Sequence, residues 1–579
     1  MSIPNTRALA TGAMYAALSG LVCARLFAHP DSPGRYDWDQ HLFYYASVLK
    51  TVVEYGRWPF WNPWYCGGNV LWQNPQVALL SPAYPLALLM SLPLAMKVNI
   101  VLHYWIGFIG MHLLLRRIVG VRSLALTVYL ACIFVAGGGL ALHLAQGHST
   151  FLPAFYLPLL LFWFCRAVST GSPRDVLAAG LLLALSVLNG GLHIAPMAAL
   201  GVAIVAAGTA AGRRQWRPVI LAIVCGAAGF AFAAPKLVPV ISFLQSANVV
   251  DERQLNRAEP MTLEMAAHAY LDRRLDPNLK FPGQLFSWHE YGNYVGLPAV
   301  LLFAVSVAWI LARTHRDAWW LGASLAAAAL LFLTLSLGEF GALAPSAWLR
   351  MLPFFSKFRI PSRYTIAVGL FAAATIGWSA RDAGWDAIGS RAVRIAVALA
   401  CTAAAADLVW RNGTHFEDVF AQPPLAHGFT WLRRPPPPQT DTAINPFEGE
   451  SPMLRALVAD RSTFHCYEPI KLQPLADPAR PLVSADGPLK ILDAAYAPDR
   501  IVVALAAGPE PSRLLINQSY DAGWRSALGP VAKDARHQNV AVDAPPRVFG
   551  RFAVTFVPRG LLAGWLLFAA AAAAAVRYG

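Results

Sequence analysis

Charged residues are scarce in this chain of 579 residues. Asp, Glu, Lys and Arg make up 13% of it and hydrophobic residues 56%, whereas a soluble domain carries about 25% charged residues. This composition argues against an ordinary soluble enzyme. The net charge is +14, but the basic residues form short clusters between apolar runs and no basic stripe interleaved with aromatics, so nucleic-acid binding is not expected.

Cysteine is also sparse, with seven residues and no CxxC spacing of the kind that indicates a metal site. Five cysteines lie inside apolar runs and are expected to be small buried hydrophobic residues: Cys23, Cys132, Cys165, Cys225 and Cys401. Cys66 and Cys466 lie in segments expected outside the membrane, where a disulfide between them is one alternative.

Acidic residues are almost missing from the apolar runs, and Asp407 lies near one end of its run. Ion-coupled transporters usually place ionisable groups near the middle of the membrane. Here the polar groups gather at the expected outer edge instead. The pattern therefore favours an enzyme that acts at the boundary between lipid and water.

Apolar runs of about 20 residues, the length that crosses a bilayer, recur about twelve times. The expected spans are 8–28, 96–115, 122–142, 150–168, 174–189, 193–211, 217–234, 296–313, 318–337, 363–380, 391–410 and 559–576. The first run lacks a convincing small-residue cleavage site, so we expect a membrane helix there and not a signal peptide. Residues 77–93 contain three prolines, which favour an interfacial segment.

The orientation follows from the short Arg-rich loops, which all fall on one side of the membrane. By the positive-inside rule this side is cytoplasmic and holds both termini. The opposite face receives residues 29–95, 235–295 and 411–558, among other loops. The polar clusters described below lie on that non-cytoplasmic face.

The region 411–558 begins with polar sequence and a polyproline linker, Pro435–Pro438. Short apolar runs at 500–505, 514–516 and 551–556 follow, separated by turn residues, and they predict a small β-sandwich. We therefore expect an α-helical polytopic membrane protein in three parts: a membrane domain at 1–410 with an exterior juxtamembrane loop at 29–95, an exterior β-rich domain at 411–558, and a final membrane helix at 559–579.

The first exterior loop contains two acids and a histidine among aromatics: Asp37, Asp39, Gln40 and His41 follow the first expected span closely. Carboxylates near a bilayer surface can have raised pKa values, which suits a general base. The structural alternative is that Asp39 caps a helix running from about residue 40 to 55 and ended by Gly56.

Further along the same loop, four tryptophan and tyrosine rings lie close together in the sequence at Trp58, Trp61, Trp64 and Tyr65. Such rings anchor proteins at membrane interfaces, and they also stack on sugars. Three amide side chains lie beside them and are candidates for substrate binding: Asn62, Asn74 and Gln76.

Two short exterior loops add five polar side chains at expected helix ends: His143, Gln146 and His148 in one loop, Asn189 and His193 in the other. A lone histidine in a loop is usually solvated and without function. Five such groups on one face of an apolar bundle indicate a site, and the three histidines are candidate substrate-binding residues.

A third cluster breaks the usual charge rule, since Lys357, Arg359 and Arg363 share one exterior loop where cations are normally rare. Guanidinium groups bind phosphate in a bidentate manner, and Lys236 lies at the outer end of another helix. These cations are candidate phosphate ligands. Contact with anionic lipid headgroups or a salt bridge to Glu339 are the alternatives.

Six short motifs, spread over nearly the whole chain, carry a resemblance to a known family. They are Asp37-Trp38-Asp39-Gln40, Trp61-Asn62-Pro63 with Gly67-Gly68, Asn74-Pro75-Gln76, Tyr291-Gly292-Asn293-Tyr294-Val295-Gly296, Arg359-Ile360-Pro361-Ser362-Arg363 and Ser519-Tyr520-Asp521-Ala522-Gly523-Trp524. In their order and spacing the chain resembles the YfhO-like bacterial membrane proteins of the GT-C glycosyltransferase superfamily. It is short for that family, and its exterior domain is compact.

The resemblance implies an inverting transfer of a sugar from a polyprenyl phosphate to an acceptor on the non-cytoplasmic face of the bacterial cytoplasmic membrane. The essential acid of the family's first exterior loop corresponds to Asp37 or Asp39, and it would deprotonate the acceptor hydroxyl. Arg359, Arg363 and Lys236 would hold the departing lipid phosphate. The acceptor would be a cell-envelope glycan, lipid or protein.

The resemblance also adds Glu290 as a candidate second acid and Tyr294 as a candidate substrate contact. Some members of the superfamily use a divalent metal and others use none, so Mg²⁺ or Mn²⁺ is left open. Two further functions remain as alternatives: a transporter or flippase for lipid-linked glycans, and a non-catalytic scaffold whose exterior domain binds glycans.

Overall fold

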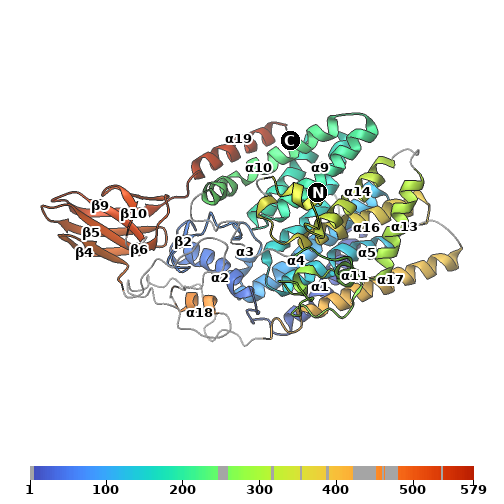
Figure 1. Cartoon of the computed structure of the whole chain (residues 1–579), viewed down its shortest axis with the longest axis horizontal. Helices are drawn as coiled ribbons and strands as arrows, with labels where there is room; N and C mark the ends of the chain where they lie inside the picture. Colours follow the sequence, from blue (N-terminus) through green and yellow to red (C-terminus); the bar gives the residue numbers. More distant parts are fainter. Residues whose placement is uncertain are drawn as a thin grey trace.

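A computed structural model describes residues 6–245, 259–313, 319–352, 355–385, 390–421, 452–459, 462, 480–535 and 539–578. These residues form a helical bundle and a β-sandwich at one end of it (Figure 1). The short elements α2 (Trp38–Leu49) and β2 (Asn69–Val70) lie between the two parts.

Every expected span contains a helix. The long helices of the bundle are α1 (Thr6–Cys23), α4 (Leu92–Leu113), α5 (Leu124–Val135), α6 (Gly138–Ala145), α7 (Leu157–Thr170), α8 (Pro173–Leu188), α9 (Ile194–Arg213), α10 (Arg217–Leu244), α13 (Leu297–Ala312), α14 (Trp319–Ser336), α16 (Thr365–Asp382), α17 (Arg391–Gly413) and α19 (Leu561–Tyr578). Among the described residues, eight helical stretches are long and apolar enough to cross a membrane. The chain is thus a multi-pass membrane protein, while the count of about twelve spans stays a prediction.

The other elements outside the β-sandwich are short. They are η1 (Ala24–Phe27), η2 (Lys50–Glu54), β1 (Trp61–Asn62), α3 (Ala83–Ala87), η3 (Leu114–Val119), η4 (Ser149–Tyr156), α11 (Leu263–Leu271), α12 (Trp288–Tyr291), α15 (Pro345–Leu349), η6 (Phe355–Lys357), η7 (Pro361–Tyr364), η8 (Thr414–Phe416) and α18 (Pro452–Val458). The juxtamembrane helix α2 begins at Trp38, two residues earlier than expected. Its N-cap position is Asp37, so the expectation that Asp39 caps this helix is wrong.

The helices differ in how much of their surface the protein covers. In the stretches that contain α5 with α6 and η4 with α7, 78% of the apolar window is buried, against 17% in the stretch that contains α17. Helices with little protein contact present their apolar surface to lipid. His143 lies in the last turn of α6 and His148 in the loop directly after it, so both lie where the two most enclosed stretches of the bundle meet.

Glycines allow one exterior segment to approach the start of α6. The Gly138 N–H donates to the carbonyl of Tyr294 at 3.1 Å, and a Cβ on Gly138 would lie 2.5 Å from the Tyr294 nitrogen. Asn293 fastens the contact, since its Oδ1 accepts from the Gly139 N–H at 2.9 Å and its Nδ2 donates to the Thr365 carbonyl at 2.9 Å. The Tyr-Gly-Asn-Tyr motif is thus held against the bundle.

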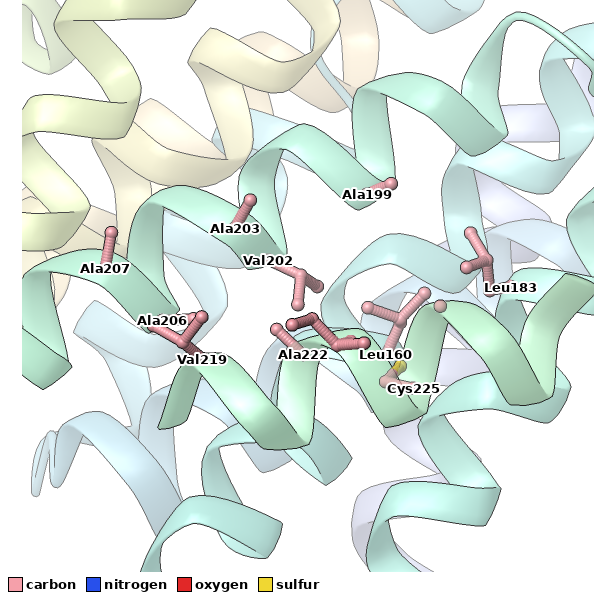
Figure 2. Close-up of a pocket in the computed structure, with 12 residues that line it drawn as sticks. Leu160, Leu183, Ala199, Val202, Ala203, Ala206, Ala207, Val219, Ala222 and Cys225 are labelled. Atoms are coloured by element: carbon pink, nitrogen blue, oxygen red, sulfur yellow. The ribbon is translucent and has the colours of Figure 1, made fainter. Parts of the chain in front are cut away.

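An apolar cavity of about 250 Å³ lies between α9 and α10, next to α7 and α8. Figure 2 shows small and aliphatic side chains around it, among them Val202 of α9, Ala222 of α10 and Leu160 of α7. Cys225 is the one titratable group in this lining. The cavity offers no set of groups for acid–base chemistry, so the candidate site must be sought elsewhere.

The β-rich region expected near the C-terminus is present. Its strands are β3 (Val483–Asp486), β4 (Leu489–Ala497), β5 (Arg500–Ala507), β6 (Ser512–Ser519), β7 (Trp524–Ser526), β8 (Val531–Lys533), β9 (Asn539–Ala544) and β10 (Phe549–Phe556). They form two antiparallel sheets, β4-β5-β10-β7 and β3-β6-β9-β8. Alternate residues such as Val503, Ile516 and Val540 fill the core between the sheets. The expected linker Pro435–Pro438 lies outside the described residues.

The first exterior loop joins the sandwich through its aromatic segment. Trp61 is 1% exposed, packs within the sandwich core, and donates from Nε1 to Gln518 Oε1 at 2.8 Å. The Ser519 N–H donates to the Gly67 carbonyl at 2.8 Å. Of the two alternatives for Trp61, interface anchoring and sugar stacking, the structure supports neither: this ring is a packing residue.

Cys66 is disulfide-bonded, and Cys466, the partner considered as one alternative above, lies outside the described residues. Each of the five cysteines in apolar runs is buried and free, as the sequence indicated.

Candidate functional site

Asp37 is held beside the loop between α6 and η4. Its backbone N–H donates to the Gln146 carbonyl at 3.1 Å, and Trp38 Nε1 donates to the Leu144 carbonyl at 3.0 Å. Gly147 adopts φ +97°, and a Cβ there would collide with the Trp38 nitrogen. The close backbone approach leaves the Asp37 carboxylate beside His148, with Oδ2 at 3.1 Å from Nε2.

His143 and His148 face each other across this loop. Their Nδ1 atoms are 3.0 Å apart. The His143 ring stacks on Phe151, with centroids 3.9 Å apart and an interplanar angle of 6°. His143 is 2% exposed, and the His148 side chain is 12% exposed. Packing therefore fixes the ring planes, and the two nitrogens point at each other from the ends of two enclosed helical stretches.

Glu290 reaches the same place from α12. Its Oε2 lies 4.0 Å from His143 Nδ1, and its Oε1 lies 3.8 Å from His289 Nε2. The carboxylate is 4% exposed and binds Arg363 through two contacts, Nε to Oε2 at 2.9 Å and Nη2 to Oε1 at 2.6 Å. Ser362 Oγ donates to the Glu290 carbonyl at 2.7 Å. This hydrogen bond holds the segment that carries Arg363 against α12.

The cluster now contains five of the candidate residues: Asp37, His143, His148, Glu290 and Arg363. They come from the first exterior loop, the end of α6 and the loop after it, α12 and η7, so the fold brings together segments that are far apart in the sequence. A cation–π contact also joins two of these segments, because the Arg363 guanidinium lies 5.4 Å from the Phe151 ring centroid.

The electrostatics of the two carboxylates follow from these contacts. Burial raises the pKa of Glu290, but Arg363 outweighs it and holds that pKa well below the usual value. Burial also raises the pKa of Asp37, and the hydrogen bond and charge of His148, with His41 and His289, bring it below the usual value. Both acids are therefore ionised at neutral pH.

Asp39 has a different environment, although it is two residues from Asp37. Its Oδ2 accepts from the Met453 N–H at 2.9 Å and its Oδ1 from the Leu454 N–H at 2.8 Å. These are the first free N–H groups of α18, so Asp39 caps that helix from another part of the chain. The structure thus separates the two acids that the sequence left equivalent.

The other candidates of the first loop mostly hold the loop itself. Gln40 Nε2 donates to the Tyr44 hydroxyl at 2.9 Å, Asn62 Nδ2 donates to Ser47 Oγ at 3.2 Å, and Asn74 Oδ1 accepts from the Gln76 N–H at 2.9 Å. His41 is closer to the cluster, since its Nδ1 lies 3.0 Å from Ser149 Oγ. Substrate binding by these residues stays a prediction.

Two further candidates lie on either side of the cluster. His193 packs on Phe151, with ring centroids 4.4 Å apart, and its buried Nε2 has no hydrogen-bond partner among the described residues. Tyr294 is engaged differently, because its hydroxyl donates to Asp407 Oδ2 at 2.7 Å, and Asp407 in turn pairs with Arg273 at 2.7 Å. Its hydroxyl is thus directed to α17 and not to the histidines.

The candidate phosphate ligands are dispersed. Arg363 lies in the cluster, whereas the Arg359 guanidinium lies 5.7 Å from the Phe286 ring centroid. Lys236 is fully buried and donates to the carbonyls of Asn74 and Val77, so it holds the loop 74–77 against α10. The side chain of Lys357 lies outside the described residues. Of the three proposed ligands, only Arg363 is seen in contact with the acid–histidine cluster within the described structure.

Sequence reasoning missed three members of the site: His289, Ser149 and Phe151. His289 lies 6.0 Å from His148, measured between ring centroids, and its Nδ1 contacts Ser287 Oγ at 2.7 Å. Its position directly before Glu290 was the available signal. Phe151 belonged to an expected membrane span, and nothing in the sequence distinguished it from other apolar residues there.

The divalent metal left open above was Mg²⁺ or Mn²⁺. Mg²⁺ requires nearly octahedral oxygen ligands. Within the cluster, the three groups close enough together to share an ion are two imidazoles and one carboxylate. This donor set does not fit a magnesium-type site, and no step of the reaction is derived through such an ion.

Comparison with known proteins identifies neither a family nor an activity for this chain. No family model matches the chain, and no curated protein matches it. A solved structure that it resembles is the mycobacterial arabinofuranosyltransferase AftD, determined by single-particle cryo-EM, with a TM-score of 0.43 and 14% sequence identity. The match covers 71% of this chain and 27% of AftD, so the chain spans about a quarter of that protein's length. A likeness of this degree assigns no activity.

Proposed function

We propose that this chain is a membrane glycosyltransferase of the GT-C type. It transfers a sugar from a polyprenyl-phosphate donor to an acceptor hydroxyl on the non-cytoplasmic face, with inversion at the anomeric carbon. The main support for the proposal is that Asp37, an acid of the first exterior loop, lies in one cluster with His148, Glu290 and Arg363.

Asp37 is the general base in this proposal. Its side chain is 39% exposed, so an acceptor can reach it, and its lowered pKa keeps it ionised. Asp39 is unsuited, because both of its oxygens accept hydrogen bonds from α18 and it is 9% exposed. In the transfer step Asp37 takes the hydroxyl proton, the acceptor oxygen bonds to the anomeric carbon, and the bond from that carbon to the phosphate oxygen breaks.

Arg363 is the group that stabilises the departing phosphate. Arginine has five N–H donors, and two contacts to Glu290 leave donors for a phosphate oxygen. Glu290 holds the guanidinium plane in place and is a positioning residue here. A charge that is fixed before the reaction stabilises a developing anion without reorganisation at the moment of transfer.

The test compares two matched substitutions, Asp37→Asn and Asp39→Asn, in protein reconstituted with radiolabelled polyprenyl-phosphate sugars and membrane extracts as acceptors. Loss of a general base lowers the rate about 10²–10⁴-fold, and we expect this for Asp37→Asn alone. Equal rates in both variants and the native protein would contradict the role of Asp37. Absence of transfer from every donor, with donor translocation across the bilayer that survives both substitutions, would contradict the enzyme and support the flippase.

A further inference from the structure

His143, His148 and Glu290 form a compact set of potential metal ligands. One ligand atom from each lies within 4.8 Å of the other two, and among the described residues this is the one group of three or more such side chains. Two members are buried and the third is nearly so. Exposed acidic groups often gather without binding an ion, but this set is enclosed and mostly imidazole.

The distance between the two histidines suits a shared ion. Zinc–nitrogen bonds are about 2.0–2.1 Å long, and two ligands at the tetrahedral angle then lie about 3.3 Å apart. The two Nδ1 atoms are 3.0 Å apart, so a small rotation of either ring provides the space. Glu290 Oε2, at 4.0 Å from His143 Nδ1, needs a side-chain shift of similar size.

Asp37 orients one of the rings. Its carboxylate accepts from His148 Nε2, and the proton on Nε2 leaves Nδ1 with a lone pair directed toward His143. Metal-binding histidines almost always donate their other N–H to a carboxylate or a carbonyl, which fixes the tautomer. Arg363 supports the carboxylate in the same way through its two bonds to Glu290.

We propose that His143, His148 and Glu290 bind one divalent ion of the zinc class, at the wall of the site and within reach of Asp37. Two imidazoles with one carboxylate are a donor set that zinc accepts with three protein ligands and one open position, which water or an anionic oxygen can take. The proposal goes beyond the glycosyltransferase function and does not depend on it.

The competing explanation is a plain hydrogen bond, with one Nδ1–H donating to the other Nδ1. The two explanations differ in metal content. Protein in lipid nanodiscs would be stripped with a chelator, loaded with Zn²⁺ alone, washed and analysed by mass spectrometry of the elements. We expect about one Zn²⁺ per chain. The native protein retaining no more zinc than empty nanodiscs would overturn the proposal.

Two variants locate the ion. The double substitution His143→Ala with His148→Ala is expected to abolish retention, whereas Asp37→Asn weakens it about 10–100-fold, as expected for the partner of a ligand. The matched control is His268→Ala, because His268 also faces a carboxylate, Asp272 at 3.5 Å, but at an exposed place. Equal retention by the double variant and the native protein would overturn the proposal.

A spectroscopic measurement on the native protein tests the site without any variant that could misfold. X-ray absorption of the zinc-loaded native protein should show imidazole scattering from two ligands, and Co²⁺ in place of Zn²⁺ should give intensified visible d–d bands. A spectrum with oxygen ligands only would overturn the proposal. Sugar transfer is measured separately, so metal retention without transfer contradicts the proposed function alone, and transfer without metal retention contradicts the metal site alone.

Discussion

Two arginine–carboxylate pairs in this protein have nearly the same geometry. Arg363 binds Glu290 through two contacts of 2.6 and 2.9 Å, and Arg57 binds Asp499 through two contacts of 2.7 and 3.0 Å. Each carboxylate is 4% exposed by side chain. The first pair joins elements of the bundle, and the second joins the first exterior loop to the β-sandwich.

The surroundings distinguish the two pairs. Glu290 lies near His143 and His289, and the cluster continues to His148 and Asp37. Near the second pair Tyr55 and Tyr496 pack edge to face, 6.4 Å apart, so its neighbours offer aromatic packing. A buried ion pair by itself is therefore no sign of a reaction, and groups that can exchange protons beside it are the informative feature.

The sharpest test of this difference removes the charge from each carboxylate in turn. Glu290→Gln leaves Arg363 without its bidentate partner and should cost about 3–5 kcal/mol of stability together with sugar transfer. Asp499→Asn should cost about 2 kcal/mol and leave transfer intact. Thermal unfolding in nanodiscs and transfer rates below the unfolding temperature check both. If Asp499→Asn abolishes transfer as completely as Glu290→Gln does, the distinction is wrong.

Substitution of Trp61 tests whether side-chain packing is the main attachment of the first exterior loop to the β-sandwich. Trp61→Ala removes a ring that is 1% exposed and packs against Trp524 and Phe556, and the expected loss is about 3–5 kcal/mol. The matched control is Trp58→Ala, because Trp58 is 61% exposed and surface changes usually stay within about 0.5 kcal/mol. Similar unfolding temperatures for the two variants would contradict the buried role of Trp61.

His41, which lies beside the cluster, should make the stability of the folded protein depend on pH. Burial lowers the pKa of His41 to about 4, whereas a histidine in an unfolded chain titrates near 6.5. As pH falls from about 6.5 to 4, the unfolded state takes up a proton that the folded state does not, so stability declines by up to about 3 kcal/mol. His41→Gln should remove the contribution of His41 to this decline, and His268→Gln should not. Unfolding measured across this pH range with an unchanged slope in His41→Gln would contradict the prediction.

The smallest expected effect separates the two aspartates. Asp39→Ala removes the acceptor for two N–H groups of α18 and should cost about 1 kcal/mol, as lost helix caps do. Asp37→Ala should cost less, because that side chain is 39% exposed. Denaturant unfolding of both variants in nanodiscs measures the difference. A larger loss for Asp37→Ala would reverse the structural assignment of the pair.

Much of the helical part followed from the sequence, because an apolar run of sufficient length has few alternatives in a bilayer. All expected spans contain a helix, and the apolar runs at 500–505, 514–516 and 551–556 lie in β5, β6 and β10. Composition and alternation decide such elements locally. No partner from another part of the chain is needed to recognise them.

The site was only partly predictable, because its contacts depend on distant segments. Asp37 and Asp39 look alike in sequence, and only the position of α18, more than 400 residues later, distinguishes them. Tyr294 was grouped with the site, but its hydroxyl meets Asp407. His289 was missed because a single histidine in a long loop carries no periodic signal. The role of Trp61 could not be predicted, because its packing partners Trp524 and Phe556 lie more than 400 residues later and no local pattern places them beside it.

Gly147 has a consequence for protein engineering. The spacing between Asp37 and His148 is fixed by backbone lying directly on backbone, at a place where any side chain on residue 147 would strike the start of α2. A bulkier residue there would displace the Asp37 carboxylate. A designer who wants room for a larger acceptor in the proposed reaction should therefore keep position 147 as glycine and enlarge the space by replacing Phe151 or His193, whose rings border the cluster, with a smaller residue.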